Sequence, residues 1–309
     1  MFMHLYYYGS VIYGVPDSVS KGGWIGRILK PKGAKVMTKF LNGRDLAGFI
    51  KERQAKQVRG LIQHDKIQPR LAILTTSRPN HENPPIETYM RMKHAYGEDI
   101  QIEVDIIRAP QDELLEIVKK LNRDAKVHGI IIQLPLDNAE GTDEIVNAVA
   151  PAKDVDALGK DATLDPATPL AILWLLAGYN IELKDKKVVL VGNGRLVGKP
   201  LSRMLRSSGV DVEVITTNTP NPSKILRAAD VIISATGVAG LIKSDDVKVG
   251  AVVVDAGTTS EQGKIVGDVA PEVRERSDLT ITPEKGGVGP LTIVALMDNT
   301  IRAARATIE

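Results

Sequence analysis

A glycine turn directly after a short apolar run constrains the fold of this chain more than any other feature. The run at 188–191 leads into Gly192-Asn193-Gly194, Gly198 follows, and a helical pattern begins there. Glycines after a strand let the backbone approach a pyrophosphate, and the N-terminus of the next helix favours its negative charge. Such turns also occur simply to join a strand tightly to a helix, so the surrounding sequence decides between the two interpretations.

The surrounding sequence alternates strand-like apolar runs with helical patterns. Expected strands lie at 70–76, 100–109, 188–191, 210–218, 229–237 and 250–257, and 127–137 is a strand that runs into a loop. Expected helices lie at 46–62, 84–97, 110–124, 167–179 and 290–305, and Gly97 is the expected C-cap of the second. This alternation is typical of βαβ units with a mostly parallel sheet, and from the glycine turn onward it has the rhythm of a Rossmann-type domain. Nucleotide binding at the turn is the favoured interpretation.

We therefore expect an α/β protein of two domains with a cleft between them. The N-terminal α/β catalytic domain would comprise residues 37–159 and be completed by the C-terminal helix, 289–309. Residues 160–288 would form the Rossmann-type dinucleotide-binding domain. Residues 1–36 are rich in aromatic side chains, and the sequence after Met37 reads like the start of a domain. We expect residues 1–36 to be an extension outside the fold, with a partner-binding tail as the alternative.

The composition argues against several classes of function. The chain of 309 residues contains no cysteine, which excludes disulfides, thiolate metal sites and a cysteine nucleophile, and fits a cytoplasmic protein. Its 5 histidines show no metal-ligand spacing. The formal net charge of +2 gives no broad electrostatic footprint for nucleic acid, and no apolar run reaches the roughly 18 to 20 residues of a membrane span. We expect no metal, nucleic acid or membrane among the partners.

Tyr89 and Lys93 stand four residues apart in an expected helix, which places both on one face. Tyr-x-x-x-Lys suggests short-chain dehydrogenases, but in those enzymes the pair follows the glycine loop, whereas here it precedes the loop by about a hundred residues. The pair therefore belongs to the other domain. The spacing alone also fits an exposed lysine beside a half-buried tyrosine.

Three later segments offer partners for this pair. Gln133 lies at the carboxyl end of an expected parallel strand, where open α/β sheets bind ligands. Asp154 and Asp156 lie in the loop between the expected domains, and 282–292 is a glycine-rich loop with prolines. Their structural alternatives are a loop terminus, a solvated acidic loop and a rigid connector.

Taken in order, these segments resemble one family. They read "YMRMK", "IIIQLPL", "KDVDA", "PATP", "GNGRLVGKP" and "TPEKGGVGPLTIVALMDNT". The order and the last segment are similar to the bifunctional methylenetetrahydrofolate dehydrogenase/methenyltetrahydrofolate cyclohydrolase family. The resemblance runs from Met37 to the C-terminus and leaves 1–36 without a counterpart.

The resemblance implies a role for each matching residue. Lys93 would be the catalytic lysine, Gln133 its orienting partner, Tyr89 the aromatic that packs on the folate, and Asp156 the carboxylate that binds the pterin. A lysine that acts as a base near neutral pH needs a pKa lowered by burial. The implied folate loop comprises Gly286, Gly287, Val288 and Pro290. The implied cofactor residues are Gly192, Asn193, Gly194, Arg195, Val197, Gly198, Pro200, Thr217, Thr236 and Gly237.

Several positions depart from the family pattern. Its Gly-Arg-Ser at the cofactor turn is Gly192-Asn193-Gly194 here, and its His-Ser pair is Thr216-Thr217. The absent arginine usually binds the 2′-phosphate of NADP, although Arg195 could replace it. We expect NADP as cofactor and keep NAD open. On the folate side, a glycine and a cysteine of the family are Ala157 and Ala167.

The resemblance implies tetrahydrofolate derivatives as substrates and a homodimer as the assembly. The alternatives are a relative with dehydrogenase activity only, which would use NAD, and a folate- or nucleotide-binding protein without catalysis. A shikimate- or amino-acid-dehydrogenase-like enzyme with a similar two-domain plan is a further alternative. The "GGVGP" loop and the Tyr89/Lys93 helix argue against that last one.

Overall fold

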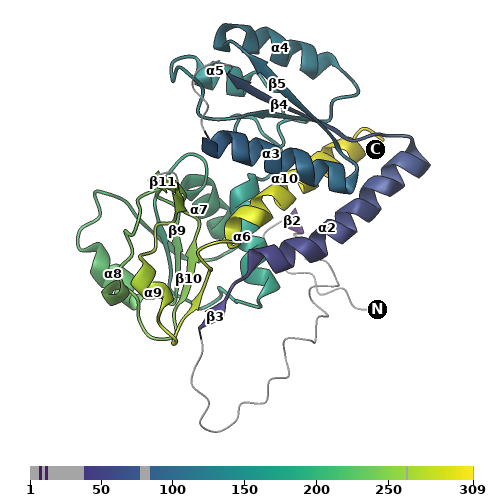
Figure 1. Ribbon diagram of the computed structural model, residues 1–309. Helices are drawn as coiled ribbons and strands as arrows, with labels where there is room; N and C mark the ends of the chain where they lie inside the picture. The colour runs from purple at the N-terminus through teal and green to yellow at the C-terminus, as the bar shows by residue number, and fades with distance from the viewer. Residues whose placement is uncertain (1–6, 9–10, 13–37, 77–83, 262–263, 309) are drawn as a thin grey trace. The chain divides into compact units, whose positions relative to one another are not determined.

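A computed structural model of the chain describes residues 7–8, 11–12, 38–76, 84–261 and 264–308 (Figure 1). The chain divides into two compact units, one formed by residues up to Phe49 with Thr168–Leu291, the other by Ile50–Ala167 with Thr292–Glu309. Three helices, α2 (Gly43–Gly60), α6 (Ala167–Gly178) and α10 (Val288–Arg305), cross from one unit into the other. No helix of the described chain is long and apolar enough to cross a membrane.

The unit that contains residues 50–167 is built on a three-stranded parallel sheet. Its strand order is β5 (Glu103–Ala109), β4 (Arg70–Thr76), β6 (Gly129–Ile132), and β4 pairs in parallel with both neighbours. The five central residues of β4 are buried, as expected of a strand covered on both faces. The helices α3 (Pro84–Ile100), α4 (Gln111–Arg123) and α5 (Thr142–Asn147) alternate with the strands along the chain (Figure 1).

Helix α4 illustrates how the sequence specifies this unit. Leu114 and Val118 lie on one face and are buried. Asp112 and Glu113 stand in the first turn and basic residues in the last, the arrangement that the helix dipole favours. The buried face packs in a core with residues of β4 and β6. The apolar periodicity therefore predicts this helix correctly, and its terminal charges agree with it.

The expected C-cap at Gly97 is wrong, because α3 continues to Ile100. A Cβ atom at Gly97 would lie 2.4 Å from Cγ2 of Val104 and 3.1 Å from the carbonyl oxygen of Ile102. Gly97 therefore allows β5 to pack against the helix, and Gln101, at φ 66°, reverses the chain after it. A glycine required for close packing gives the same local signal as a glycine that ends a helix.

The other unit has a six-stranded parallel sheet. The strand order is β3 (Lys39–Phe40), β13 (Thr280–Ile281), β10 (Val252–Asp255), β9 (Val231–Ser234), β7 (Val188–Val191), β8 (Val212–Ile215). The expected Rossmann-type alternation is confirmed, with α7 (Gly198–Ser207) between β7 and β8, α8 (Pro222–Ala228) before β9 and α9 (Pro271–Arg274) before β13. A short hairpin, β11 (Thr259–Glu261) and β12 (Lys264–Val266), follows β10.

The first strand after Met37 differs from the expectation. Lys39–Phe40 pairs with β13, so these residues, expected to begin the catalytic domain, extend the sheet of the other unit. In the N-terminal extension, β1 (Tyr7–Tyr8) pairs antiparallel with β2 (Val11–Ile12). The rest of residues 1–36 lies outside the described residues, and with it the expectation that the extension stays outside the fold.

Candidate functional site

Lys93 and Gln133 form the centre of the candidate site in the unit that contains residues 50–167. The Nζ of Lys93, on α3, donates a hydrogen bond of 2.9 Å to Oε1 of Gln133. Gln133 directly follows β6, and its backbone N–H donates to the carbonyl of Leu74 at 2.8 Å. Its amide Nε2 donates to the carbonyl of Leu134 at 3.1 Å, which turns Oε1 toward the lysine. A ligand-binding position at the carboxyl end of parallel strands is the general rule for α/β sheets.

Asp156 interacts electrostatically with Lys93. Burial lowers the pKa of Lys93 below the usual lysine value, and the negative charge of Asp156 partly offsets this effect. Burial also raises the pKa of Asp156, with Lys93 acting in the opposite direction. Desolvation thus brings the amine closer to its neutral form, the form that can accept a proton.

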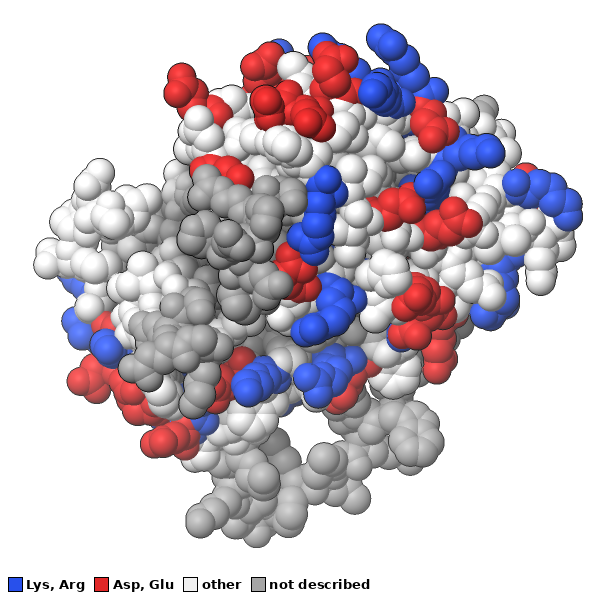
Figure 2. Space-filling view, turned by 45° about the horizontal axis from the view of Figure 1, so that its top comes forward, with Lys and Arg blue, Asp and Glu red and all other residues white. Residues whose placement is uncertain are grey.

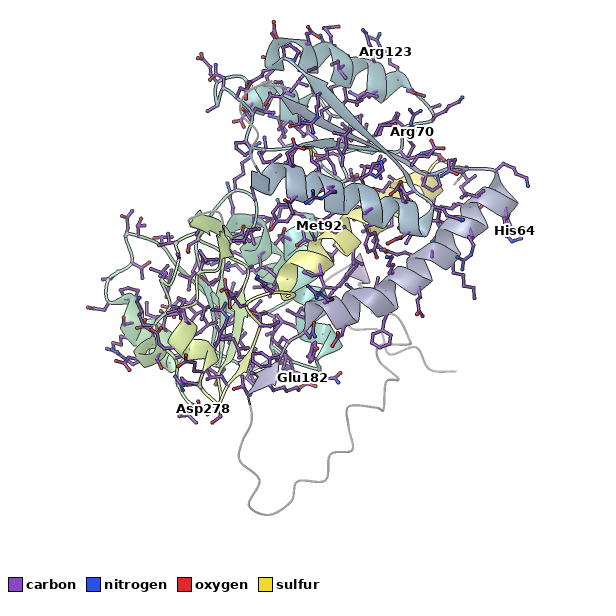
Figure 3. All side chains as sticks on the ribbon, in the orientation of Figure 1. His64, Arg70, Met92, Arg123, Glu182 and Asp278 are labelled. Carbon is purple, nitrogen blue, oxygen red and sulfur yellow. The ribbon has the colours of Figure 1, made fainter. Side chains whose placement is uncertain are left out.

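Tyr89 lies one turn before Lys93 on α3. Met90 is buried, and Met92, labelled in Figure 3, is 43% exposed, so the helix has a core side and an open side. Tyr89 and Lys93 are both half-buried between these two sides. Burial raises the pKa of the Tyr89 phenol, which keeps its hydroxyl protonated at neutral pH. Lys93 is therefore not the exposed lysine that spacing alone allowed.

The two aspartates of "KDVDA" have different roles. Asp154 is buried and accepts hydrogen bonds from the backbone N–H groups of Leu158, at 3.3 Å, and Gly159, at 2.8 Å. It closes the loop in which Asp156 stands. The preceding carbonyl, of Lys153, accepts from the N–H of Ile130 at 2.8 Å, so the segment continues the sheet beside β6. Asp154 is thus structural, and Asp156 is the carboxylate beside the lysine.

Ala157 stands where the family pattern has glycine, and its backbone conformation is one that glycine favours. Its φ of 54° lies in the left-handed region, which costs a residue with a Cβ roughly 1–2 kcal/mol. Glycine, the residue of the family at this position, takes this conformation without that cost. The loop is held in place here by Asp154 in spite of the alanine.

Asn299 is a site-supporting residue that sequence reasoning missed. It is fully buried in α10, and its Nδ2 donates to the carbonyls of Val155, at 2.9 Å, and Asp165, at 2.8 Å. It therefore ties the C-terminal helix to the backbone beside Asp156. The sequence did carry a signal, since Asn299 belongs to the "NT" pair of the last family segment.

The glycine turn follows β7 in the other unit as expected. Gly192 has φ 101°, and a Cβ on it would lie 2.6 Å from the carbonyl oxygen of Ala235. A Cβ on Gly198 would lie 2.2 Å from the carbonyl oxygen of Gly192. The turn can close only with glycine at both positions. Gly194 differs, because a Cβ there would meet nothing within 4 Å.

The start of α7 fits the diphosphate of a dinucleotide. In the described structure Val197, its N-cap residue, makes no side-chain capping bond, and the first turn holds no acidic residue. A helix N-terminus of this kind favours an anion. Pro200 is buried in the first turn, and the open space at Gly194 lies where the backbone must admit a ligand closely. The residues present therefore fit the cofactor that the sequence suggested.

The remaining expected cofactor residues lie in the same unit. Asn193 and Arg195 are exposed in the glycine turn, and Thr217 is exposed in the turn after β8. That turn is closed by Thr219, whose hydroxyl accepts from the N–H of Thr216 at 2.9 Å. Thr236 and Gly237 follow β9, whose neighbour in the sheet is β7.

The expected folate loop is compact and rests on the start of α2. Gly286, at φ 86°, accepts a hydrogen bond of 3.0 Å from the N–H of Arg44. A Cβ on Gly43 would lie 1.9 Å from the carbonyl oxygen of Gly287, so the helix and the loop touch backbone to backbone. Val288 then begins α10, with Pro290 in its first turn. This loop belongs to the unit that carries the six-stranded sheet.

Two surface hollows lie elsewhere. They have volumes of about 460 and 670 Å³, both are lined by residues of β5, and neither is lined by Lys93, Gln133 or Asp156. Among the described residues no group of three or more acidic or histidine side chains could hold a metal ion. Acidic and basic side chains are interspersed over the face seen in Figure 2.

Fold and site together define a two-unit α/β protein, in which a Rossmann-type unit with a glycine turn is joined to a second parallel α/β unit that carries a lysine–glutamine–aspartate site. A family model described as "Tetrahydrofolate dehydrogenase/cyclohydrolase, catalytic domain" matches residues 41–156. A second, described as the NAD(P)-binding domain of the same family, matches residues 166–308.

Individual relatives match along most of the chain. "Bifunctional protein FolD" of Exiguobacterium sibiricum is 36% identical over 282 residues, which cover 87% of this chain and 100% of the relative. The crystal structure of the bifunctional enzyme FolD from Campylobacter jejuni is 35% identical with a TM-score of 0.81, over 87% of this chain and 99% of that one. The Trypanosoma brucei FolD structure, complexed with NADP and an inhibitor, is 27% identical with a TM-score of 0.81, over 88% and 99%. The chain therefore belongs to the tetrahydrofolate dehydrogenase/cyclohydrolase family.

Proposed function

We propose that the chain oxidises 5,10-methylenetetrahydrofolate to the 5,10-methenyl form with NADP and hydrolyses that product to 10-formyltetrahydrofolate. It is accordingly an oxidoreductase and a hydrolase of one-carbon metabolism. The observation that carries the proposal is Lys93 itself. Its amine is held by Gln133, and burial lowers its pKa. A protein that only bound folate would not need a partly neutral, oriented amine.

The family resemblance suggests a role for each residue, and the arrangement of Lys93 and Gln133 supports these roles. Bound nicotinamide would accept the hydride of the methylene bridge, which leaves the methenyl cation. Water then adds to the methenyl carbon, and the neutral amine of Lys93 takes one proton from it. The bond from that carbon to N5 breaks, Lys93 returns the proton to N5, and the second proton of the water is released as the formyl C=O forms. Gln133 holds the amine in position, Asp156 binds the donor edge of the pterin, and Tyr89 packs on its ring.

The cofactor preference is also part of the proposal. The NADP complex of the Trypanosoma brucei relative supports NADP, and the exposed Arg195 and Lys199 at the glycine turn supply positive charge for a 2′-phosphate. The departures at Asn193 and at the Thr216-Thr217 pair favour NAD instead. Rates measured side by side with the two cofactors decide between them.

A cytoplasmic homodimer completes the proposal. The absence of cysteine fits a reducing compartment. In the three-stranded sheet, residues 153–154 cover the outer side of β6, whereas β5 is the terminal strand among the described residues. Such a strand presents unpaired backbone groups to a second chain. Arg70, labelled in Figure 3, holds Asp105 of that strand at 2.5 Å.

The test of the proposed chemistry is Lys93→Met in the full chain. Cyclohydrolase turnover should fall by at least about 100-fold, because the proton acceptor is lost, while binding of methenyltetrahydrofolate stays measurable. Lys119→Met, on the exposed face of α4, is the matched control and should keep the parent's rate. A Lys93→Met protein that hydrolyses at the parent's rate would show that the lysine has another role.

A further inference from the structure

Two buried aspartates lie next to each other in the unit that carries the six-stranded sheet. Asp255 is the last residue of β10, and Asp268 lies two residues after the end of β12. Asp268 is 0% exposed and Asp255 is 9% exposed. With Arg274 they form what we call the aspartate cluster. None of the three belongs to the residues that sequence reasoning assigned to substrate or cofactor.

Asp268 holds the loop that follows β9. Its Oδ2 accepts hydrogen bonds from the hydroxyl of Ser234, at 2.6 Å, and the N–H of Thr236, at 2.7 Å. Its Oδ1 accepts from the N–H of Val238 at 3.0 Å. Two backbone N–H groups and a hydroxyl from residues 234–238 thus converge on a single carboxylate. Hydrogen bonds to a charged acceptor in a dry environment are the stronger kind, so the backbone of this loop is fixed.

Asp255 in turn holds Asp268. Its carboxylate accepts from the backbone N–H groups of Asp268, at 3.0 Å, and Val269, at 3.1 Å. Arg274 donates to Asp255 at 2.5 Å and to the carbonyl of Val269 at 2.5 Å, which supplies the countercharge. Arg274 thus fixes Asp255, and Asp255 fixes the backbone of Asp268.

Two glycines make room for the carboxylates. A Cβ on Gly257 would lie 1.9 Å from Oδ1 of Asp268, and a Cβ on Gly267 would lie 2.1 Å from Oδ2 of Asp255. Both distances are far below any real contact. The aspartates and these glycines are therefore one constellation, since neither carboxylate could reach its position beside a larger residue.

The loop that Asp268 holds also contacts the glycine turn. A Cβ on Gly192 would lie 2.6 Å from the carbonyl oxygen of Ala235 and 3.1 Å from Cγ2 of Thr236. The two loops that end β7 and β9 therefore pack directly on each other at the carboxyl edge of the sheet, where dinucleotides bind in this type of fold. A displaced loop 235–238 would displace the glycine turn as well.

We propose that Asp268 is a positioning residue of the NADP site, which holds Ala235–Val238 against the glycine turn and is itself held by Asp255 and Arg274. The inference rests on the proposed function, because it takes the glycine turn as the cofactor site. Asp268 acts through the loop and not by contact with the dinucleotide. Its loss would weaken cofactor binding and leave the chemistry of Lys93 in the other unit unchanged.

The test is Asp268→Asn in the full chain. The amide keeps the size of the carboxylate but offers one acceptor oxygen in place of two. At least one of the three donors, the hydroxyl of Ser234 and the N–H groups of Thr236 and Val238, therefore loses its acceptor. KM for NADP should rise by about tenfold, the effect of losing one such bond, with dehydrogenase turnover at saturating NADP and cyclohydrolase turnover nearly unchanged. NADP binding measured directly by calorimetry should weaken by the same factor.

Asp246→Asn is the matched control. Asp246 is also a buried aspartate of this unit, and it accepts from the N–H of Lys243 at 3.1 Å within its own helical turn. It should leave KM for NADP unchanged. If it raises KM as much as Asp268→Asn does, or if Asp268→Asn binds NADP as the parent does, Asp268 has no positioning role.

Ser234→Ala keeps the proposal testable if Asp268→Asn does not fold. It removes a single donor to the same carboxylate, so KM for NADP should rise by a smaller factor, about threefold. An unchanged KM in this variant would overturn the proposal. A parent chain that binds no NADP in the same calorimetric assay would instead overturn the proposed function.

Discussion

The amine of Lys93 and the amide oxygen of Gln133 lie 2.9 Å apart, although 40 residues separate them in the chain. The lysine comes from the middle of α3 and the glutamine from the end of β6. The side-chain amide of Gln133 is fixed by its own bond to the carbonyl of Leu134, so the contact has a defined direction. The lysine is held, and its burial favours the neutral amine.

Gln133→Leu tests this contact. The variant keeps the volume of the side chain and removes the oxygen that holds the amine, so Lys93 should lose its orientation. We expect cyclohydrolase turnover to fall by about 100-fold, with thermal stability close to that of the parent. Gln111→Leu, at the half-buried start of α4, is the control and should keep turnover. Equal turnover in the parent and Gln133→Leu would contradict the orienting role.

The pH dependence of the cyclohydrolase follows from the lowered pKa of Lys93. Only the neutral amine accepts a proton, so turnover should rise with pH as Lys93 loses its proton and then level off. The midpoint should lie below the usual lysine pKa because burial disfavours the ammonium form. A rate–pH profile in a buffer series of constant ionic strength measures it.

Asp156→Asn should shift that midpoint further. The carboxylate raises the pKa of Lys93, so its removal should move the midpoint of the residual activity to lower pH. The overall rate should also fall, since the same carboxylate is proposed to bind the pterin. A midpoint that moves to higher pH would be the wrong sign and would contradict the electrostatic pairing.

Ala157→Gly should stabilise the protein. Glycine removes the cost of the left-handed conformation at φ 54° but gains entropy in the unfolded chain, so the net increase in the free energy of unfolding should be about 0.5–1 kcal/mol. Chemical denaturation measures it. Ala150→Gly, outside the left-handed region, is the control and should destabilise. A destabilised Ala157→Gly would show that the loop bears no strain.

Substitutions at the glycine turn should separate folding from cofactor binding. Gly198→Ala places a Cβ against the carbonyl of Gly192 and should lower the melting temperature and abolish NADP binding. In Gly194→Ala the new Cβ meets nothing within 4 Å, so the melting temperature should equal that of the parent. It should nevertheless weaken NADP binding, because the new methyl group enters the space left for the ligand. If Gly194→Ala binds NADP with the parent's affinity, the dinucleotide does not use that space.

Ile106→Lys tests the proposed homodimer. A charge on the terminal strand β5 should prevent pairing with a second chain, so the mass measured by light scattering should fall from two chains to one. Ile265→Lys, on a short strand of the other unit, is the control and should leave the mass unchanged. If the parent protein already has the mass of one chain by light scattering, the proposed dimer is refuted.

The sequence by itself determined the elements and their class. Apolar runs and helical periodicity predicted β4 and β7 with their observed bounds and the presence of the longer helices, because these patterns record which side of each element is buried. The short helices α5, α8 and α9 were not predicted. Gly192 and Gly198 were recognisable because the turn between a parallel strand and its helix requires them. The motifs in order indicated the family that the comparisons then showed.

Only the tertiary structure decided which members of a motif meet. Asp154 and Asp156 look equivalent in "KDVDA", yet one closes the loop and the other interacts electrostatically with Lys93. Gly97 looks like a helix end and is a packing contact, and Asn299 reaches a carbonyl 144 residues away. The aspartate cluster gave no local signal at all. Periodicity describes a residue and its near neighbours, whereas burial, pKa and long-range hydrogen bonds depend on which distant segments pack together.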